Sequence, residues 1–134
     1  MVMEGKQVRL AQFSAIMHAF GTKLGYYDPK NWKQARYIAP IMCLWGDIQG
    51  CASAMLFAPD DKKPECLEKY AALIRKACGL FEKMLAHHNG NFIAGTSLTI
   101  ADFVMASFFS VQVMNPKSPF QSTNKDIVKD FPVF

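Results

Sequence analysis

Apolar residues recur at every third and fourth position over long stretches of this chain, a pattern typical of helices that bury one face. The pattern predicts helices over residues 14–24, 29–57, 64–88 and 99–114, with a turn or short helix at 126–130. The segment 99–114 is apolar on almost every side, so we expect it to be buried in the core. The fold is therefore predicted to be mainly helical.

Residues with strong preferences for helix ends mark the boundaries of these segments. Asp28 is expected to cap the second helix, with Pro29 in its first turn, where a proline loses no hydrogen bond. Pro64 opens the third helix in the same way. Gly25 and Gly90 are placed to end the first and third helices, because glycine adopts a left-handed backbone at little cost.

The most specific local signal precedes the last long helix. Thr99 and Asp102 have the spacing of a capping box, in which each side chain bonds to the backbone N–H of the other residue. Leu98 and Phe103 flank this pair at the positions of a hydrophobic staple. We therefore expect the helix to begin at Thr99.

The N-terminal residues have a different pattern, with short apolar runs around a glycine. Met1–Met3 and Gln7–Ala11 flank Glu4–Lys6, which predicts a β-hairpin with Val8 and Leu10 facing a core. No other segment is predicted to be a strand, and an isolated hairpin is marginally stable in water. We therefore expect further strands to be missing upstream.

Composition indicates a soluble globular chain, with 51% apolar and 19% charged residues, without repeats or a signal peptide. The net charge is +4, but basic residues are scattered and the longest pure run is Lys62–Lys63. We expect no nucleic-acid partner. No apolar stretch reaches the length of about 20 residues that a membrane helix needs, so no membrane association is expected.

Neither the cysteines nor the histidines predict a metal site. The chain has four cysteines: Cys43, Cys51, Cys66 and Cys78. Their spacing fits neither a zinc site nor a dense disulfide scaffold, so we interpret them as small buried apolar residues. His87 and His88 are adjacent at a helix end, without a nearby cysteine or carboxylate pair, and are expected to be surface residues.

Three segments resemble the cytosolic glutathione S-transferase family, closest to its sigma-like classes. Residues 91–103 resemble the segment that leads into the central helix of the family's C-terminal domain. Residues 4–16 resemble the last hairpin and helix of its thioredoxin-like, glutathione-binding domain, and residues 24–29 resemble the interdomain linker. The likeness covers nearly the whole chain.

This resemblance implies a helical bundle of the transferase C-terminal type, preceded by a β-hairpin and helix from a thioredoxin-like domain. Residues 1–25 would be the remnant of that domain, and 26–134 an all-helical domain that is incomplete at its end. The family's catalytic Tyr, Ser or Cys and its cis-proline would fall before Met1. The chain is expected to be truncated and inactive alone, with an exposed apolar patch around Val8, Leu10, Ile16 and Phe20.

The resemblance also implies candidate binding residues. Gln12 matches the family's Gln-Ser pair, which holds the γ-glutamyl end of glutathione, but Phe13 stands in place of the serine. Ser14, one position later, either replaces that serine or caps the helix, and we favour capping. Met42 and Trp45 either line a pocket for a hydrophobic co-substrate or belong to the core, which is the commoner role.

Three functions remain open at this point. By resemblance, the chain belongs to a cytoplasmic, homodimeric detoxification enzyme that conjugates glutathione, its co-substrate, to hydrophobic electrophiles. Alternatively, it is a non-catalytic protein-interaction module, as in translation elongation factor gamma subunits. A third reading is a non-enzymatic binder of hydrophobic ligands. No cofactor or metal is expected in any of these cases.

Overall fold

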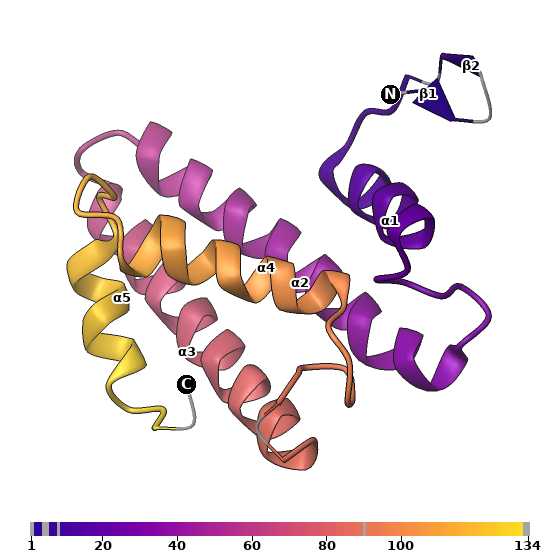
Figure 1. The fold of residues 1–134 in the computed structure, drawn as a ribbon. Coiled ribbons are helices and arrows are strands. Elements are labelled where there is room, and N and C mark those ends of the chain that lie inside the picture. Colours follow the sequence, from indigo (N-terminus) through magenta and orange to yellow (C-terminus); the bar gives the residue numbers. More distant parts are fainter. Residues whose placement is uncertain (1, 4–5, 8, 90, 133–134) are drawn as a thin grey trace.

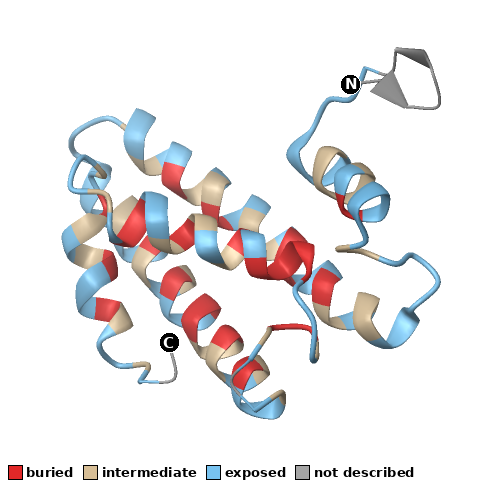
Figure 2. Cartoon of the chain, in the orientation of Figure 1, coloured by how far each residue is buried: buried red, intermediate tan, exposed pale blue. Residues whose placement is uncertain are grey.

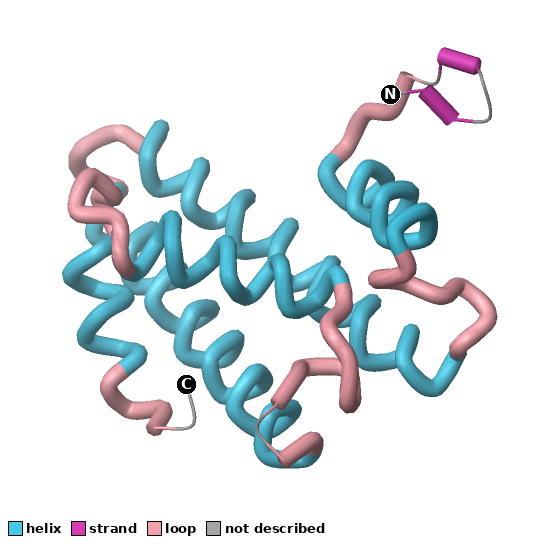
Figure 3. Tube along the Cα trace, viewed as in Figure 1, coloured by secondary structure: helices cyan, strands magenta, loops and turns pink. Residues whose placement is uncertain are grey.

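The computed structural model describes residues 2–3, 6–7, 9–89 and 91–132 of the chain. Helices account for most of it (Figure 3), as the apolar pattern predicts. In chain order, the helices are α1 (Phe13–Leu24), α2 (Trp32–Phe57), α3 (Lys63–His87), α4 (Ile100–Phe108), the π-helix η1 (Phe109–Val113) and α5 (Gln121–Val128).

Two very short strands precede the helices. β1 (Val2–Met3) pairs antiparallel with β2 (Lys6–Gln7), so that Val2 lies opposite Gln7 and Met3 opposite Lys6. The pairing is shorter than predicted, because no strand continues to Ala11. Leu10 is 37% exposed and does not face a core, and Val8 lies outside the described residues.

The start of α2 differs from the prediction because a neighbouring residue takes over the cap. Asp28 Oδ1 accepts a hydrogen bond from the N–H of Lys30 at 2.9 Å and forms a local turn. Asn31 then caps α2, its Oδ1 accepting from the N–H of Gln34 at 3.2 Å. Asp28 therefore does not cap this helix.

The ends of α1 and α3 follow the predicted pattern more closely. Gly25 has a left-handed φ of 82° and ends α1 where expected. Helix α3 ends at His87, and the residue with left-handed φ beyond it is Asn89, at 58°. Gly90, the predicted stop, lies outside the described residues.

The core lies between α2, α3 and α4, and α5 packs against α3 and η1 (Figures 1 and 2). The predicted apolar faces are buried: Ile38, Ile41 and Ile48 of α2 and Ile74 and Phe81 of α3 are at most 1% exposed. Burying one side chain of this size is worth about 1.5–3 kcal/mol relative to leaving it in water. The apolar faces of α2 and α3 therefore contribute to the stability of the bundle.

The predicted helix over 99–114 changes from an α-helix to a π-helix at its end. The N–H of Met114 bonds to the carbonyl of Phe109 at 2.8 Å, five residues back, so this turn is a π-helix. The carbonyl of Gln112 accepts from Asn124 Nδ2 at 3.1 Å, and the same amide donates to Tyr70 Oη at 3.0 Å. The fully buried Asn124 thereby joins η1, α3 and α5.

Helix α1 approaches α4 through a glycine. A Cβ at Gly21 would lie 2.5 Å from Ile100 Cγ2 and 3.0 Å from the Cβ of Tyr27. The carbonyl of Gly21 also accepts from the N–H groups of Tyr26 and Tyr27, at 2.8 and 3.1 Å. The absence of a side chain at Gly21 therefore sets how closely α1 meets the bundle.

We expect Gly21→Ala to destabilise the chain by about 1–3 kcal/mol, because the new methyl group overlaps the stiff, buried Ile100 side chain. Gly46→Ala is the matched control. It is also a helical glycine, nothing lies within 4 Å of its added Cβ, and it is expected to stabilise by about 0.5–1 kcal/mol. Urea denaturation followed by circular dichroism measures both, and equal effects would contradict the close approach.

Candidate functional site

The start of α4 is organised by one buried carboxylate. Thr99 and Asp102 form the predicted capping box, and Asp102 is only 6% exposed. Asp102 Oδ2 accepts from the N–H of Thr99 at 2.7 Å and from its hydroxyl at 2.8 Å. Asp102 Oδ1 accepts from the N–H of Ile93 at 2.8 Å. This last bond, which sequence spacing does not predict, ties the preceding loop to the helix.

The residues of the predicted staple have other neighbours. The Phe103 ring packs edge-on against Tyr26, with ring centroids 5.1 Å apart. The carbonyl of Tyr26 accepts from the N–H of Ile100 at 3.1 Å, so the linker after α1 joins the start of α4. Leu98 and Phe103 are each 38% exposed, and a staple between them stays a prediction.

The predicted glutathione segment lies at the start of α1. Gln12 precedes the helix with a left-handed φ of 72°, and its carbonyl accepts from the N–H of Ile16 at 3.0 Å. Ser14 lies inside the helix, where its hydroxyl is 3.3 Å from His18 Nδ1, so the capping interpretation of Ser14 is wrong. The Phe13 ring lies 6.2 Å from that of Trp45 on α2.

An apolar groove runs between α1 and α4, beside Phe13; we call it the α1–α4 groove. Its volume is about 320 Å³. It is lined by Phe13, Met17, Phe20, Gly21, Leu24, Tyr26, Ile100, Phe103 and Ser107. Phe20 is 41% and Leu24 61% exposed, whereas Ile16 is half-buried. Part of the expected apolar patch is therefore present on this face.

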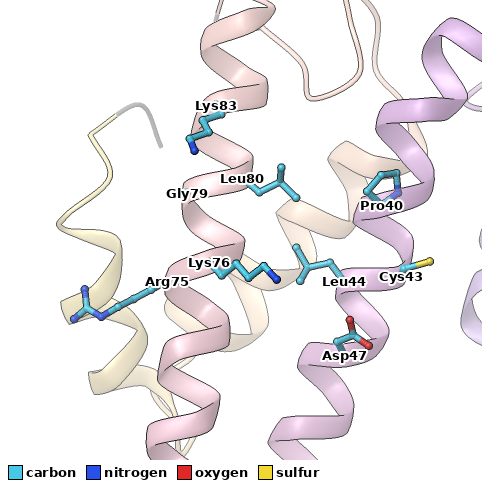
Figure 4. Close-up of a pocket in the computed structure, with 9 residues that line it drawn as sticks. All are labelled: Pro40, Cys43, Leu44, Asp47, Arg75, Lys76, Gly79, Leu80 and Lys83. Carbon is cyan, nitrogen blue, oxygen red and sulfur yellow. The ribbon is translucent and has the colours of Figure 1, made fainter.

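A larger groove, the α2–α3 groove, lies between those two helices (Figure 4) and has a volume of about 530 Å³. It is lined by Pro40, Cys43, Leu44, Asp47, Arg75, Lys76, Gly79, Leu80 and Lys83. Arg75 extends toward α5, and its Nη1 donates to Oδ2 of Asp130, which follows that helix, at 2.7 Å. Lys76 and Lys83 keep one rim of the groove positive.

Met42 and Trp45, the predicted pocket residues, do not line the α2–α3 groove. Met42 is 5% exposed and belongs to the core, whereas Trp45 is half-buried against Phe13. Met42 thus lies in the core, and Trp45 packs against it from the same helix. A role for either in holding a hydrophobic co-substrate stays a prediction.

A family model described as the C-terminal domain of glutathione S-transferase matches residues 46–132, well over half of the chain. The chain belongs to the glutathione S-transferase family. No curated protein matches it. The matched segment begins within α2 and includes α3, the Asp102 network, α4, η1 and α5.

The four cysteines differ more in exposure than the sequence suggests. Cys78 is fully buried, Cys51 and Cys66 are half-buried, and Cys43 is exposed. The prediction of four buried cysteines is wrong for Cys43, because Cys43, like Pro40, lies on the solvent-exposed face of α2. Burial raises the pKa of the Cys78 thiol to about 12, which removes it as a nucleophile near neutral pH.

The described part of the transferase domain offers no cluster for a metal. Within it, no three or more His, Cys, Asp or Glu side chains gather closely enough to hold an ion. His87 and His88 are close to each other, with ring centroids 4.8 Å apart, but no third side chain of these types joins them. None of its described helices is long and apolar enough to cross a membrane.

We expect Asp102→Asn to lower the free energy of unfolding by at least about 2 kcal/mol, because the amide group leaves a buried donor without an acceptor. Asp126→Asn is the control, since it makes the same change in an exposed pair with Lys129. Urea denaturation should show no measurable change for the control. A similar midpoint for both variants would contradict the structural role of Asp102.

We also expect the chain to lose stability in alkaline solution. The unfolded Cys78 thiol ionises near its ordinary pKa of about 8.5, whereas burial keeps the folded thiol protonated to about pH 12. The free energy of unfolding should therefore fall as pH rises above about 8.5. In Cys78→Ala the free energy of unfolding should fall less steeply with pH. Tyr70, whose pKa burial raises to about 12, still contributes to the fall above about pH 10. Identical slopes in urea titrations would refute this account.

Proposed function

We propose that this chain acts as part of a glutathione-conjugating transferase, in which the start of α1 holds the γ-glutamyl end of glutathione. The co-substrate is a hydrophobic electrophile, and the setting is a cytoplasmic homodimer. Dimerisation, localisation and a detoxification role rest on family membership alone. The glutathione site rests on one further observation, the backbone of Gln12.

Gln12 is strained at the position that matches the family's glutathione motif. A left-handed φ at a residue other than glycine costs about 1–3 kcal/mol and is concentrated at ligand sites. The first N–H groups of α1 lack intrahelical partners, as in any helix, and no side chain caps them. These groups favour a carboxylate, which the γ-glutamyl end of glutathione carries.

The chain by itself, on this proposal, does not conjugate glutathione. A free thiol with a pKa near 8.5 is mostly protonated at neutral pH and must be activated by a nearby hydroxyl or a positive helix end. Tyr70 does not fill this role, because it is fully buried and bonded to Asn124. The family match covers the helical domain, whereas the resemblance assigns thiol activation to the thioredoxin-like domain.

A second function, a non-catalytic interaction module, is favoured by Phe13. At the position of the family's serine, Phe13 presents an aromatic ring to Trp45 and no hydroxyl to a ligand. The adjoining α1–α4 groove is apolar, as a protein-binding surface would be. Retention on immobilised glutathione separates this function from the first.

We expect the folded chain to be retained on glutathione resin and to elute with free glutathione. Gln12→Ala should weaken retention about tenfold, because it removes the side chain that matches the motif. Gln49→Ala, a glutamine on α2 outside the motif, is the matched control and should elute like the parent chain.

Phe13→Ser restores the family's residue and should strengthen retention. If a folded parent chain and Phe13→Ser both pass through the resin, the glutathione site is refuted and the interaction module is favoured. We also expect no glutathione-dependent conjugation of a chlorodinitroarene by the chain alone. A rate clearly above buffer would refute its inactivity.

A further inference from the structure

A third pocket, with polar walls, lies at the end of α3, away from the two grooves described above. Its volume is about 430 Å³. It is lined by Asn31, Lys33, Gln34, Arg36, Tyr37, His87, His88, Ala94, Gly95, Thr96 and Ser97. We call it the histidine pocket. Its walls come from the first turns of α2, the end of α3 and the loop before α4.

The charges lining the histidine pocket are of one sign. Lys33 and Arg36 contribute two cations, and the lining contains no aspartate or glutamate. Within the described residues, neither Lys33 nor Arg36 forms an ion pair. This distinguishes the histidine pocket from the α2–α3 groove, where Asp47 lies among the cations and Arg75 is paired with Asp130.

The guanidinium of Arg36 is held in place by aromatic contacts. Its Nη2 donates to Tyr37 Oη at 2.9 Å, and its carbon lies 4.7 Å from the Tyr37 ring centroid. Tyr37 Oη in turn lies 3.3 Å from His87 Nε2. A planar guanidinium carries five N–H donors, so most of them remain for a ligand. The contacts with Tyr37 therefore orient the guanidinium in the absence of a ligand.

His88 adds a polar atom without a partner. Its Nε2 is buried, and no described residue forms a hydrogen bond with it. Its ring meets Tyr37 edge-on, with centroids 4.8 Å apart. Burial, His87 and Arg36 lower the pKa of His88. The imidazole is thus neutral at neutral pH and can donate one hydrogen bond without a charge.

The loop opposite these residues adds hydroxyl groups on a fixed backbone. Gln34 Nε2 donates to Ser97 Oγ at 3.4 Å, and Thr96 lies next to Ser97 in the lining. Ile93, just before this wall, is held by the bond of its N–H to Asp102 Oδ1. The loop that carries these hydroxyl groups is therefore bonded to α4 at Ile93 and to α2 through Gln34.

We propose that the histidine pocket binds a phosphate group, either as free phosphate or as the head of a small phosphomonoester. A tetrahedral oxyanion needs several donors from different directions, which Lys33, Arg36 and the hydroxyls of Thr96 and Ser97 supply. Guanidinium and phosphate match in geometry, forming two parallel hydrogen bonds. A pocket of about 430 Å³ also has the size of a small-molecule site, which leaves room for an organic group.

The test titrates the intact chain near neutral pH with inorganic phosphate and, separately, with phenyl phosphate, at constant ionic strength set by sodium chloride. Binding is followed by the NMR signals of the His87 and His88 rings. We expect saturable shifts with both probes. Lys33→Gln and Arg36→Gln should each weaken binding about tenfold, because each removes a charged donor.

The control is Lys76→Gln in the α2–α3 groove, which removes the same charge from another exposed site and should leave binding unchanged. Tighter binding of phenyl phosphate supports a phosphomonoester, and equal affinities support free phosphate. Shifts no larger than those in sodium chloride would overturn the proposal. So would equal weakening by Lys76→Gln and Arg36→Gln, which would indicate a response to net charge. Circular dichroism checks that each variant is folded.

Discussion

The carboxylate of Asp102 is the interaction on which the rest of this structure depends. It accepts three hydrogen bonds from Thr99 and Ile93, and so fixes both the first turn of α4 and the loop before it. Through α4 it positions Ile100, against which Gly21 of α1 rests. Through Ile93 it holds the residue that precedes the loop wall of the histidine pocket. One buried charge therefore determines features on two separate faces, and its loss would disturb both.

Helices could be predicted from the sequence because apolar periodicity and end signals act within a few residues. The pair Thr99 and Asp102 was predictable for this reason, since both partners lie in one turn. The bond from Ile93 was not, because residues nine apart across an irregular loop leave no periodic trace. That Asn31 and not Asp28 caps α2 was also not predicted. Both residue types favour the cap position, and the local turn at Asp28 decides which of them occupies it.

The site was less predictable than the fold, because its geometry comes from contacts between elements. The sequence placed Gln12 and Phe13 just before a helix, but it did not predict the strained φ of Gln12 or the packing of Phe13 on Trp45. The histidine pocket joins Arg36 and His88, which come from different helices and match no motif. Such a cluster becomes visible only once packing has brought its members together.

The narrow attachment of α1 has a consequence for how the chain opens. Helix α1 meets the bundle through Phe13, Met17 and Gly21, while Phe20 and Leu24 remain exposed, so detaching α1 exposes less buried surface than unfolding the bundle. Opening of such a segment requires less free energy than global unfolding. We expect α1 to separate transiently about the linker that follows Gly25, while α2 to α5 stay folded. A protease that cuts this linker would leave the bundle intact, so one chain would contain two parts with different proteolytic lifetimes.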